Sequence, residues 1–118
     1  MSVSPSYKAF VLEQLAAAGT TVTARSMFGG VGLYCQGLFF ALIDDDTLYL
    51  KVDDATRADF ERLGAQPFRP FGDDSHVMQY YELPADVLED RSAVRPWVER
   101  ALDAARRKAS GKRRRPKA

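Results

Sequence analysis

Hydrophobic residues near the N-terminus recur at helical spacing. Val11, Leu15 and Ala18 are separated by four and three positions, which places them on one face of a helix. Ser4 is followed by a proline, and a serine N-cap with proline in the first helical position is a common start. Gly19 supplies the left-handed residue that often ends a helix. The pattern therefore predicts an amphipathic helix that begins at this proline and ends at Ala18.

The next thirty residues change to an alternation with a period of two. Hydrophobic and polar positions alternate through residues 20–52, and short segments rich in glycine or aspartate interrupt them at 29–30, 36–37 and 44–46. Connections this short can join only antiparallel neighbours. We therefore expect an antiparallel β-meander, in which residues 38–43, apolar on both faces, form a central strand.

A short helix and a further strand follow the meander. Asp53 or Asp54 can cap a helix that ends near Leu63, where the following glycine stops it. Two prolines keep residues 66–71 extended, and after a turn residues 77–83 alternate again. The chain is thus expected to return to the sheet with one more strand.

A hydrophobic stripe defines the last helix. Its members are spaced by one, three or four positions: Val94, Trp97, Val98, Ala101, Leu102 and Ala105. Pro96 is tolerated only in the first turn, which favours Ser92 over Asp90 as the N-cap. The predicted fold class is α+β, an antiparallel β-meander sheet packed with N-terminal and C-terminal helices.

The charge distribution adds a second region. The chain has 118 residues, 46% of them hydrophobic, which is enough for one domain with a core. Its net charge is only +1, but eight basic residues and no acidic one follow residue 105. They are Arg106, Arg107, Lys108, Lys112, Arg113, Arg114, Arg115 and Lys117. Residues 1–105 hold 9 basic and 16 acidic residues, a net charge of −7.

We therefore expect a folded domain over residues 1–105 and a basic, disordered tail over 106–118. From Ala109 the tail has no large apolar residue, and serine, glycine and proline interrupt any helix. Clustered basic residues can contact nucleic-acid phosphates weakly and without sequence preference. The alternative is a solvated end, or a tail that folds back on the acidic body.

Few residues can support catalysis or metal binding. The one cysteine and the one histidine cannot supply the three or four protein ligands of a zinc site. Cys35 shares its alternation with Val31 and Leu33, which favours a core position over a nucleophile with His76 as its base. Aspartates 44–46 lack the glycine of a calcium loop. We expect no catalytic residue, no metal and no cofactor.

A glycine-rich bend is the strongest candidate for ligand contact. Gly30 and Gly32 begin a dinucleotide-binding pattern, but a cysteine occupies its third glycine position and a strand follows, which excludes that site. Two interpretations remain. Arg25, Gly29, Gly30 and Gly32 could form a small backbone anion site, or the glycines could allow a bulge or a tight bend.

Aromatic residues of the strands could also form a platform that stacks bases. They are Phe39, Tyr49, Phe68, Phe71, Tyr80 and Tyr81. Strand aromatics are usually core residues, and the body around these is acidic, so the core interpretation is favoured.

Several blocks of sequence resemble the N-terminal domain of the TfoX/Sxy family, the bacterial regulators of natural competence. They are residues 25–34, 40–42, 48–52, 64–68, 78–84 and the helix that carries Trp97. The resemblance implies an α+β domain. In the full-length regulators this domain precedes a helical one, and together they promote transcription of competence genes with a cyclic-AMP receptor protein. We expect this chain to be a stand-alone first domain.

Two hypotheses follow. The first is a non-enzymatic cytoplasmic domain that binds a protein partner, such as part of the transcription machinery, with weak nucleic-acid contact by the tail. The second is a small-molecule or anion-binding domain, or an enzyme, that uses the bend at residues 29–32. A single cysteine, no signal peptide and no run of 18 apolar residues predict a cytoplasmic protein without membrane contact.

Overall fold

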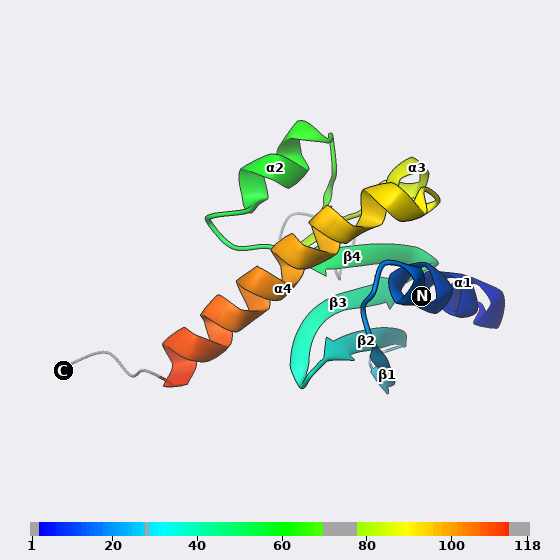
Figure 1. The fold of residues 1–118 in the computed structure, drawn as a ribbon, viewed down its shortest axis with the longest axis horizontal. Coiled ribbons are helices and arrows are strands. Elements are labelled where there is room, and N and C mark those ends of the chain that lie inside the picture. Colours follow the sequence, from blue (N-terminus) through cyan, green and yellow to red (C-terminus); the bar gives the residue numbers. More distant parts are fainter. Residues whose placement is uncertain (1–2, 28, 70–77, 114–118) are drawn as a thin grey trace.

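The computed structural model describes residues 3–27, 29–69 and 78–113, and within them six strands form one sheet. The strand order is β1-β2-β3-β4-β6-β5, and every pair is antiparallel (Figure 1). The strands are β1 (Thr23–Met27), β2 (Gly30–Cys35), β3 (Leu38–Asp44), β4 (Thr47–Lys51), β5 (Pro67–Phe68) and β6 (Met78–Glu82). The helices are α1 (Pro5–Ala17), α2 (Arg57–Arg62), α3 (Ala85–Leu88) and α4 (Arg91–Arg113). The predicted α+β class and meander are confirmed.

Left-handed residues close the hairpins where the sequence predicts them. Gln36 and Gly37 have φ values of 52° and 80°, and Asp45 and Asp46 both have φ of 52°. Two consecutive positive φ values give the turn whose twist matches that of the flanking strands. These turns fix β2, β3 and β4 as sequential neighbours.

Both ends of α1 are capped as expected. The Ser4 hydroxyl oxygen accepts a hydrogen bond of 3.2 Å from the N–H of Tyr7. Gly19 has φ of 87°, and the N–H of Thr20 donates to the carbonyl of Leu15 at 3.0 Å. This is the Schellman arrangement, which satisfies carbonyls that the end of a helix leaves without partners.

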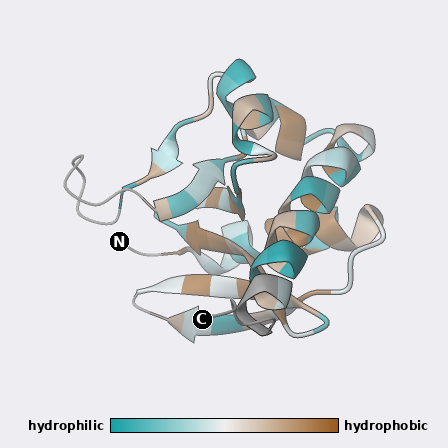
Figure 2. Cartoon of the chain, turned by 90° about the vertical axis from the view of Figure 1, so that its left-hand side faces the viewer, coloured by the Kyte–Doolittle hydropathy of each residue, from teal (hydrophilic) through white to brown (hydrophobic). Residues whose placement is uncertain are grey.

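The main core lies between the sheet and α4, which crosses β3 and β4 with α1 beside it (Figure 1). Figure 2 shows the helix on one side of the sheet, whose inner strands carry hydrophobic residues. Its side chains with no exposed surface include Leu33, Ile43, Leu50 and Val94. No helix in the described ranges is both long and apolar enough to cross a membrane.

A bulge in β3 decides which aromatic residue enters the core. Leu33 pairs with Ala41, whereas the next residue, Tyr34, pairs with Phe39, so Phe40 is extra. Phe40 is fully buried in the core cluster. The ring of Phe39 stacks on Tyr34 with centroids 5.0 Å apart. The bulge therefore points Phe40 toward the helices and Phe39 toward the other face of the sheet.

The start of α4 differs from the prediction. The Asp90 carboxylate accepts the N–H of Ser92 at 3.0 Å, and the Asp90 carbonyl accepts the N–H groups of Ala93 and Val94. Asp90, not Ser92, caps the helix, and Pro96 lies inside it. The missing N–H costs one hydrogen bond, which the buried stripe on either side of the proline outweighs.

The end of α4 also corrects the predicted tail. The helix continues through Ser110 and Gly111 to Arg113, so residues 106–113 are ordered as helix rather than disordered. Propagating a helix that packing has already nucleated adds one hydrogen bond per residue, and one glycine costs only about 1 kcal/mol. Arg114, Arg115 and Lys117 lie outside the described residues.

One buried polar residue, Gln14, ties α1 to α3 and α4. It is 3% exposed, its Nε2 donates to the carbonyl of Leu88 at 2.8 Å, and its Oε1 accepts from Arg91 Nε at 2.9 Å. The predicted amphipathic pattern did not find it, because glutamine counts as a polar position.

We expect Gln14→Leu to destabilise the domain by about 1–3 kcal/mol, since the Leu88 carbonyl loses its side-chain donor and the Arg91 guanidinium its acceptor. Urea unfolding followed by circular dichroism measures the change. Glu13→Leu, at an exposed position of the same helix, is the control and should change stability by less than about 0.5 kcal/mol. Equal effects of the two variants would contradict the assigned role of Gln14.

Candidate functional site

The structure brings the predicted anion-site residues together at the β1–β2 hairpin. Arg25 pairs with Gly32 across the two strands, Gly30 pairs with Met27, and Gly29 has φ of 80° in the turn. The Arg25 guanidinium lies 5.7 Å from the centroid of the Tyr34 ring. The guanidinium thus packs over an aromatic ring.

The protein itself fills the space beside Gly30 and Gly32. A Cβ on Gly32 would lie 2.6 Å from Met27 Cε and 3.2 Å from Phe39 Cε1, and one on Gly30 would lie 2.5 Å from the Ile43 carbonyl oxygen. A carbonyl oxygen repels an anion. The geometry favours the second interpretation of the bend, in which glycine permits close approach of neighbouring strands. The anion site remains a prediction.

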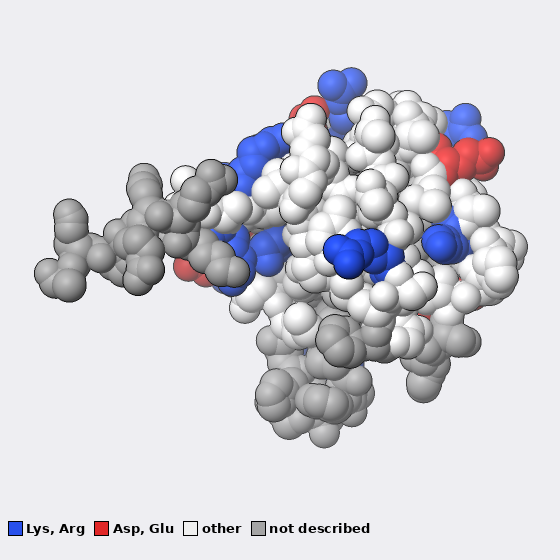
Figure 3. All heavy atoms as spheres, turned by 90° about the horizontal axis from the view of Figure 1, so that it is seen from below, with Lys and Arg blue, Asp and Glu red and all other residues white. Residues whose placement is uncertain are grey.

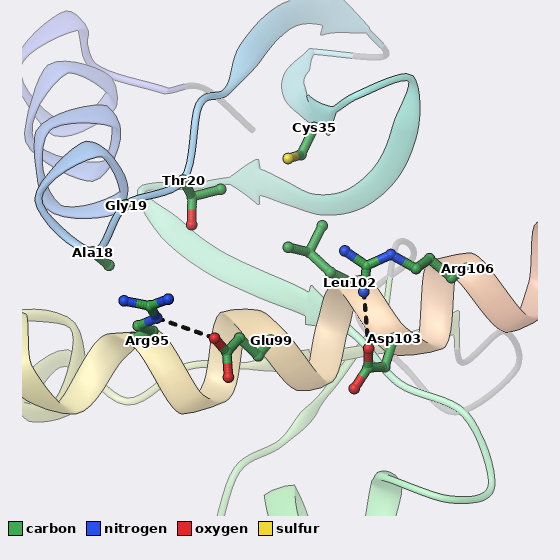
Figure 4. A pocket seen from close by; sticks show the side chains of 9 residues that line it. All are labelled: Ala18, Gly19, Thr20, Cys35, Arg95, Glu99, Leu102, Asp103 and Arg106. Carbon is green, nitrogen blue, oxygen red and sulfur yellow. Dashed lines mark hydrogen bonds and ion pairs between the residues drawn. The ribbon is translucent and has the colours of Figure 1, made fainter.

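Cys35 lies on the wall of a cavity of about 270 Å³ between the end of α1, β2 and α4 (Figure 4). Cys35 is half-buried and packs against the core cluster, so it is less enclosed than the predicted core position. Across the cavity, Arg95 pairs with Glu99 at 3.0 Å and Arg106 with Asp103 at 2.9 Å. His76, the other half of the unfavoured catalytic pair, lies outside the described residues.

The basic residues at the end of α4 differ in their partners. Arg106 pairs with Asp103 on its own helix, and Arg107 forms two hydrogen bonds, 2.6 and 3.1 Å, to the Asp53 carboxylate. The hydrogen bond from Arg107 lowers the pKa of Asp53. Lys and Arg side chains gather beside this end of the helix (Figure 3). The part of the chain expected to be a free tail is therefore joined to the body, at least through Arg107.

Lys108 lines the same cavities as Lys51, a lysine that sequence reasoning missed. Lys51, the last residue of β4, is 9% exposed, and its Nζ lies 4.9 Å from the centroid of the Tyr80 ring. Burial lowers the pKa of Lys51, the charge of Lys108 lowers it further, and Asp53 partly offsets this. The only signal in the sequence is a lysine between Leu50 and Val52 in an otherwise apolar run.

Two cavities share Lys51 and Lys108 as lining residues. One, of about 270 Å³, has apolar walls that include Leu38, Phe39 and Tyr80. The other, of about 420 Å³, is polar and includes the pair of Asp53 and Arg107. The arrangement can hold a small negatively charged group between two ammonium ions. Within the described ranges, no group of three or more His, Cys, Asp or Glu residues could hold a metal ion.

Most of the predicted aromatic platform divides between two clusters. Phe39 contacts Tyr80 at a centroid distance of 5.6 Å, and Tyr49 contacts Phe68 at 4.8 Å. Tyr81 instead belongs to the core, and Phe71 lies outside the described residues. Stacking of nucleic-acid bases on these rings stays a prediction.

Comparison with known proteins gives two findings. The family model for the TfoX N-terminal domain matches residues 13–105. The DNA transformation protein TfoX1 of Aliivibrio fischeri (strain ATCC 700601 / ES114) is 44% identical over 45 residues. That alignment covers 38% of this chain and 22% of the relative, so the chain matches only about a fifth of that protein.

Proposed function

The chain belongs to the TfoX N-terminal domain family, and on this premise we propose that it is a cytoplasmic, non-enzymatic domain related to competence. In this proposal the C-terminal end of α4 contacts nucleic-acid phosphates, and the folded body binds a protein partner of the transcription machinery. The name of the similar DNA transformation protein supports the link to competence.

The observation that carries the nucleic-acid part is the continuation of α4 to Arg113. Residues 106–113 extend the helix by about 12 Å. They follow Asp103, the last acidic residue of the chain. The side chains of Arg106 and Arg107 are 54% and 49% exposed, so each can exchange its carboxylate for a phosphate. Such contacts add affinity without reading bases.

The surroundings of Cys35 support a role without catalysis. The acidic residues across the cavity, Glu99 and Asp103, are each paired with an arginine of the same helix. Both are carboxylates, whereas the base that activates a nucleophilic thiol is usually a histidine.

DNA binding by two charge variants tests the nucleic-acid part. We expect Lys112→Gln with Arg113→Gln to weaken binding of a short labelled DNA duplex at least about fivefold at low salt, because two phosphate contacts are lost. Fluorescence anisotropy measures the dissociation constant. Lys8→Gln with Arg62→Gln removes the same charge from α1 and α2 and should change it less than twofold. Equal losses in both double variants, or no binding by the unchanged chain, would contradict a site at the end of α4.

A pull-down tests the partner. Tagged full-length chain is expected to capture the same protein from native cell lysate with and without nuclease treatment. Loss of every captured protein after nuclease treatment would show that nucleic acid alone holds the assembly.

A further inference from the structure

We propose that the junction of α4 with β3, β4 and β6 binds a small organic anion, a flat aromatic ring that carries a phosphate or a carboxylate group. This goes beyond the proposed function, because the ligand enters a cavity of the body instead of lying along the end of the helix. Three features of the junction support it: a pair of ammonium groups, an aromatic wall and two open cavities of small-molecule size.

The ammonium groups of Lys51 and Lys108 provide the charge. They come from β4 and α4, and both residues line both cavities. Within the described ranges, Lys51 has the Tyr80 ring as a partner and no carboxylate within 4 Å of its Nζ. The nearest acidic influence, Asp53, is held by two hydrogen bonds from Arg107. An anion between the lysines would offset both the burial of Lys51 and its repulsion by Lys108.

The remaining charges of the polar cavity cancel in pairs. Asp53 is bound by Arg107, and Asp54 lies 3.0 Å from Arg57. Lys51 and Lys108 therefore leave this cavity with an excess of two positive charges. A monoanion or dianion matches that excess.

The apolar cavity provides the contact for a ring. Its walls include Leu38, Phe39, Tyr80 and Ala105. The rings of Phe39 and Tyr80 lie 5.6 Å apart at an interplanar angle of 42°, so an aromatic ligand can pack edge or face against either one. Burial raises the pKa of Tyr80 to about 12. Its phenol therefore stays protonated at neutral pH and is a hydrogen-bond donor.

The cavity volumes limit the size of the ligand that can bind. They are about 270 and 420 Å³, close to the lower end of the range for small-molecule sites. One aromatic ring with one anionic group fits this scale, and a polymer does not.

NMR titration of the full chain with four probes tests the proposal without any substitution. Phenyl phosphate and benzoate carry ring and charge, inorganic phosphate carries only charge, and phenol carries only the ring. We expect phenyl phosphate or benzoate to shift the signals of Lys51, Tyr80 and Lys108, with an affinity at least tenfold above those of inorganic phosphate and phenol. The stronger of the two aromatic anions identifies the anionic group.

No shift of these signals with either aromatic anion up to millimolar concentration would overturn the proposal. Equal affinity for inorganic phosphate would overturn the role of the ring, and equal affinity for phenol would overturn the role of the lysines.

Charge variants give a second readout. We expect Lys51→Met and Lys108→Met each to weaken binding of the better aromatic anion at least tenfold. Circular dichroism checks that each variant keeps the fold. Lys8→Met on α1 is the matched control and should leave affinity unchanged. Lys51→Met removes a buried charge, so its melting temperature should equal or exceed that of the unchanged chain. Unchanged affinity in either cavity variant would overturn the site.

Discussion

Phe60→Ala is expected to destabilise the domain by about 3–5 kcal/mol, because it leaves a cavity where α2, β6 and α4 pack together. Phe60 has no exposed surface, and its ring centroid lies 5.0 Å from that of Trp97 and 6.3 Å from that of Tyr81. The total stability of a domain of this size is about 5–15 kcal/mol. Urea unfolding should therefore show a midpoint far below that of the unchanged chain.

Two further variants calibrate this result. Trp97→Ala should cost less than Phe60→Ala, because Trp97 is only partly buried and Arg100 covers its ring at 4.6 Å. Leu63→Ala, at a residue 37% exposed just after α2, should change stability by less than about 0.5 kcal/mol. A loss at Leu63 equal to that at Phe60 would contradict the assignment of Phe60 as the buried anchor of α2.

Gly30→Ala is expected to cost about 1–3 kcal/mol by overpacking at the start of β2. The new Cβ would lie 2.5 Å from the backbone oxygen of Ile43, so the β2–β3 ladder itself must shift. Gly32→Ala is the matched comparison. Its close neighbours are side-chain atoms of Met27 and Phe39, and the flexible methionine can move. Urea unfolding should rank Gly30→Ala as the more destabilising variant, and the opposite order would contradict this account of the bend.

Local signals predicted most of the fold. The serine cap and Gly19 placed α1, and the two short turns placed the hairpins, because each depends on backbone chemistry within a few residues. The predicted start of α4 at Ser92 was wrong. The prediction considered only the hydrogen bond that Pro96 loses inside a helix, whereas burial of the stripe from Val94 to Ala105 determines where the helix lies. The predicted tail begins at residue 106, whereas α4 continues to Arg113, because a packed helix propagates through a single Gly111.

The candidate sites depended on contacts that sequence spacing does not show. The glycines at 29–32 suggested an anion site, but Met27 and Phe39 reach the position beside Gly32 from two other strands. Lys51 was overlooked because a lysine at the end of a strand is usually solvated. Only the packing of α4 shows that Lys108 lines the same two cavities and that Tyr80 lies under the ammonium group of Lys51. Charge along the sequence locates the basic end, but it does not show the attachment of this end through Arg107 to Asp53.

The salt dependence of DNA binding by the full chain shows whether the basic end of α4 contacts phosphates. Anisotropy titrations at several salt concentrations give the slope of log K against log salt, which is about −0.9 for each phosphate contact on duplex DNA. Eight basic residues follow residue 105, and the acidic body repels DNA, so we predict a slope between about −2 and −7 with no preference among duplex sequences. A slope near zero, or binding that one sequence strengthens many-fold, would contradict phosphate contact by the basic end of α4.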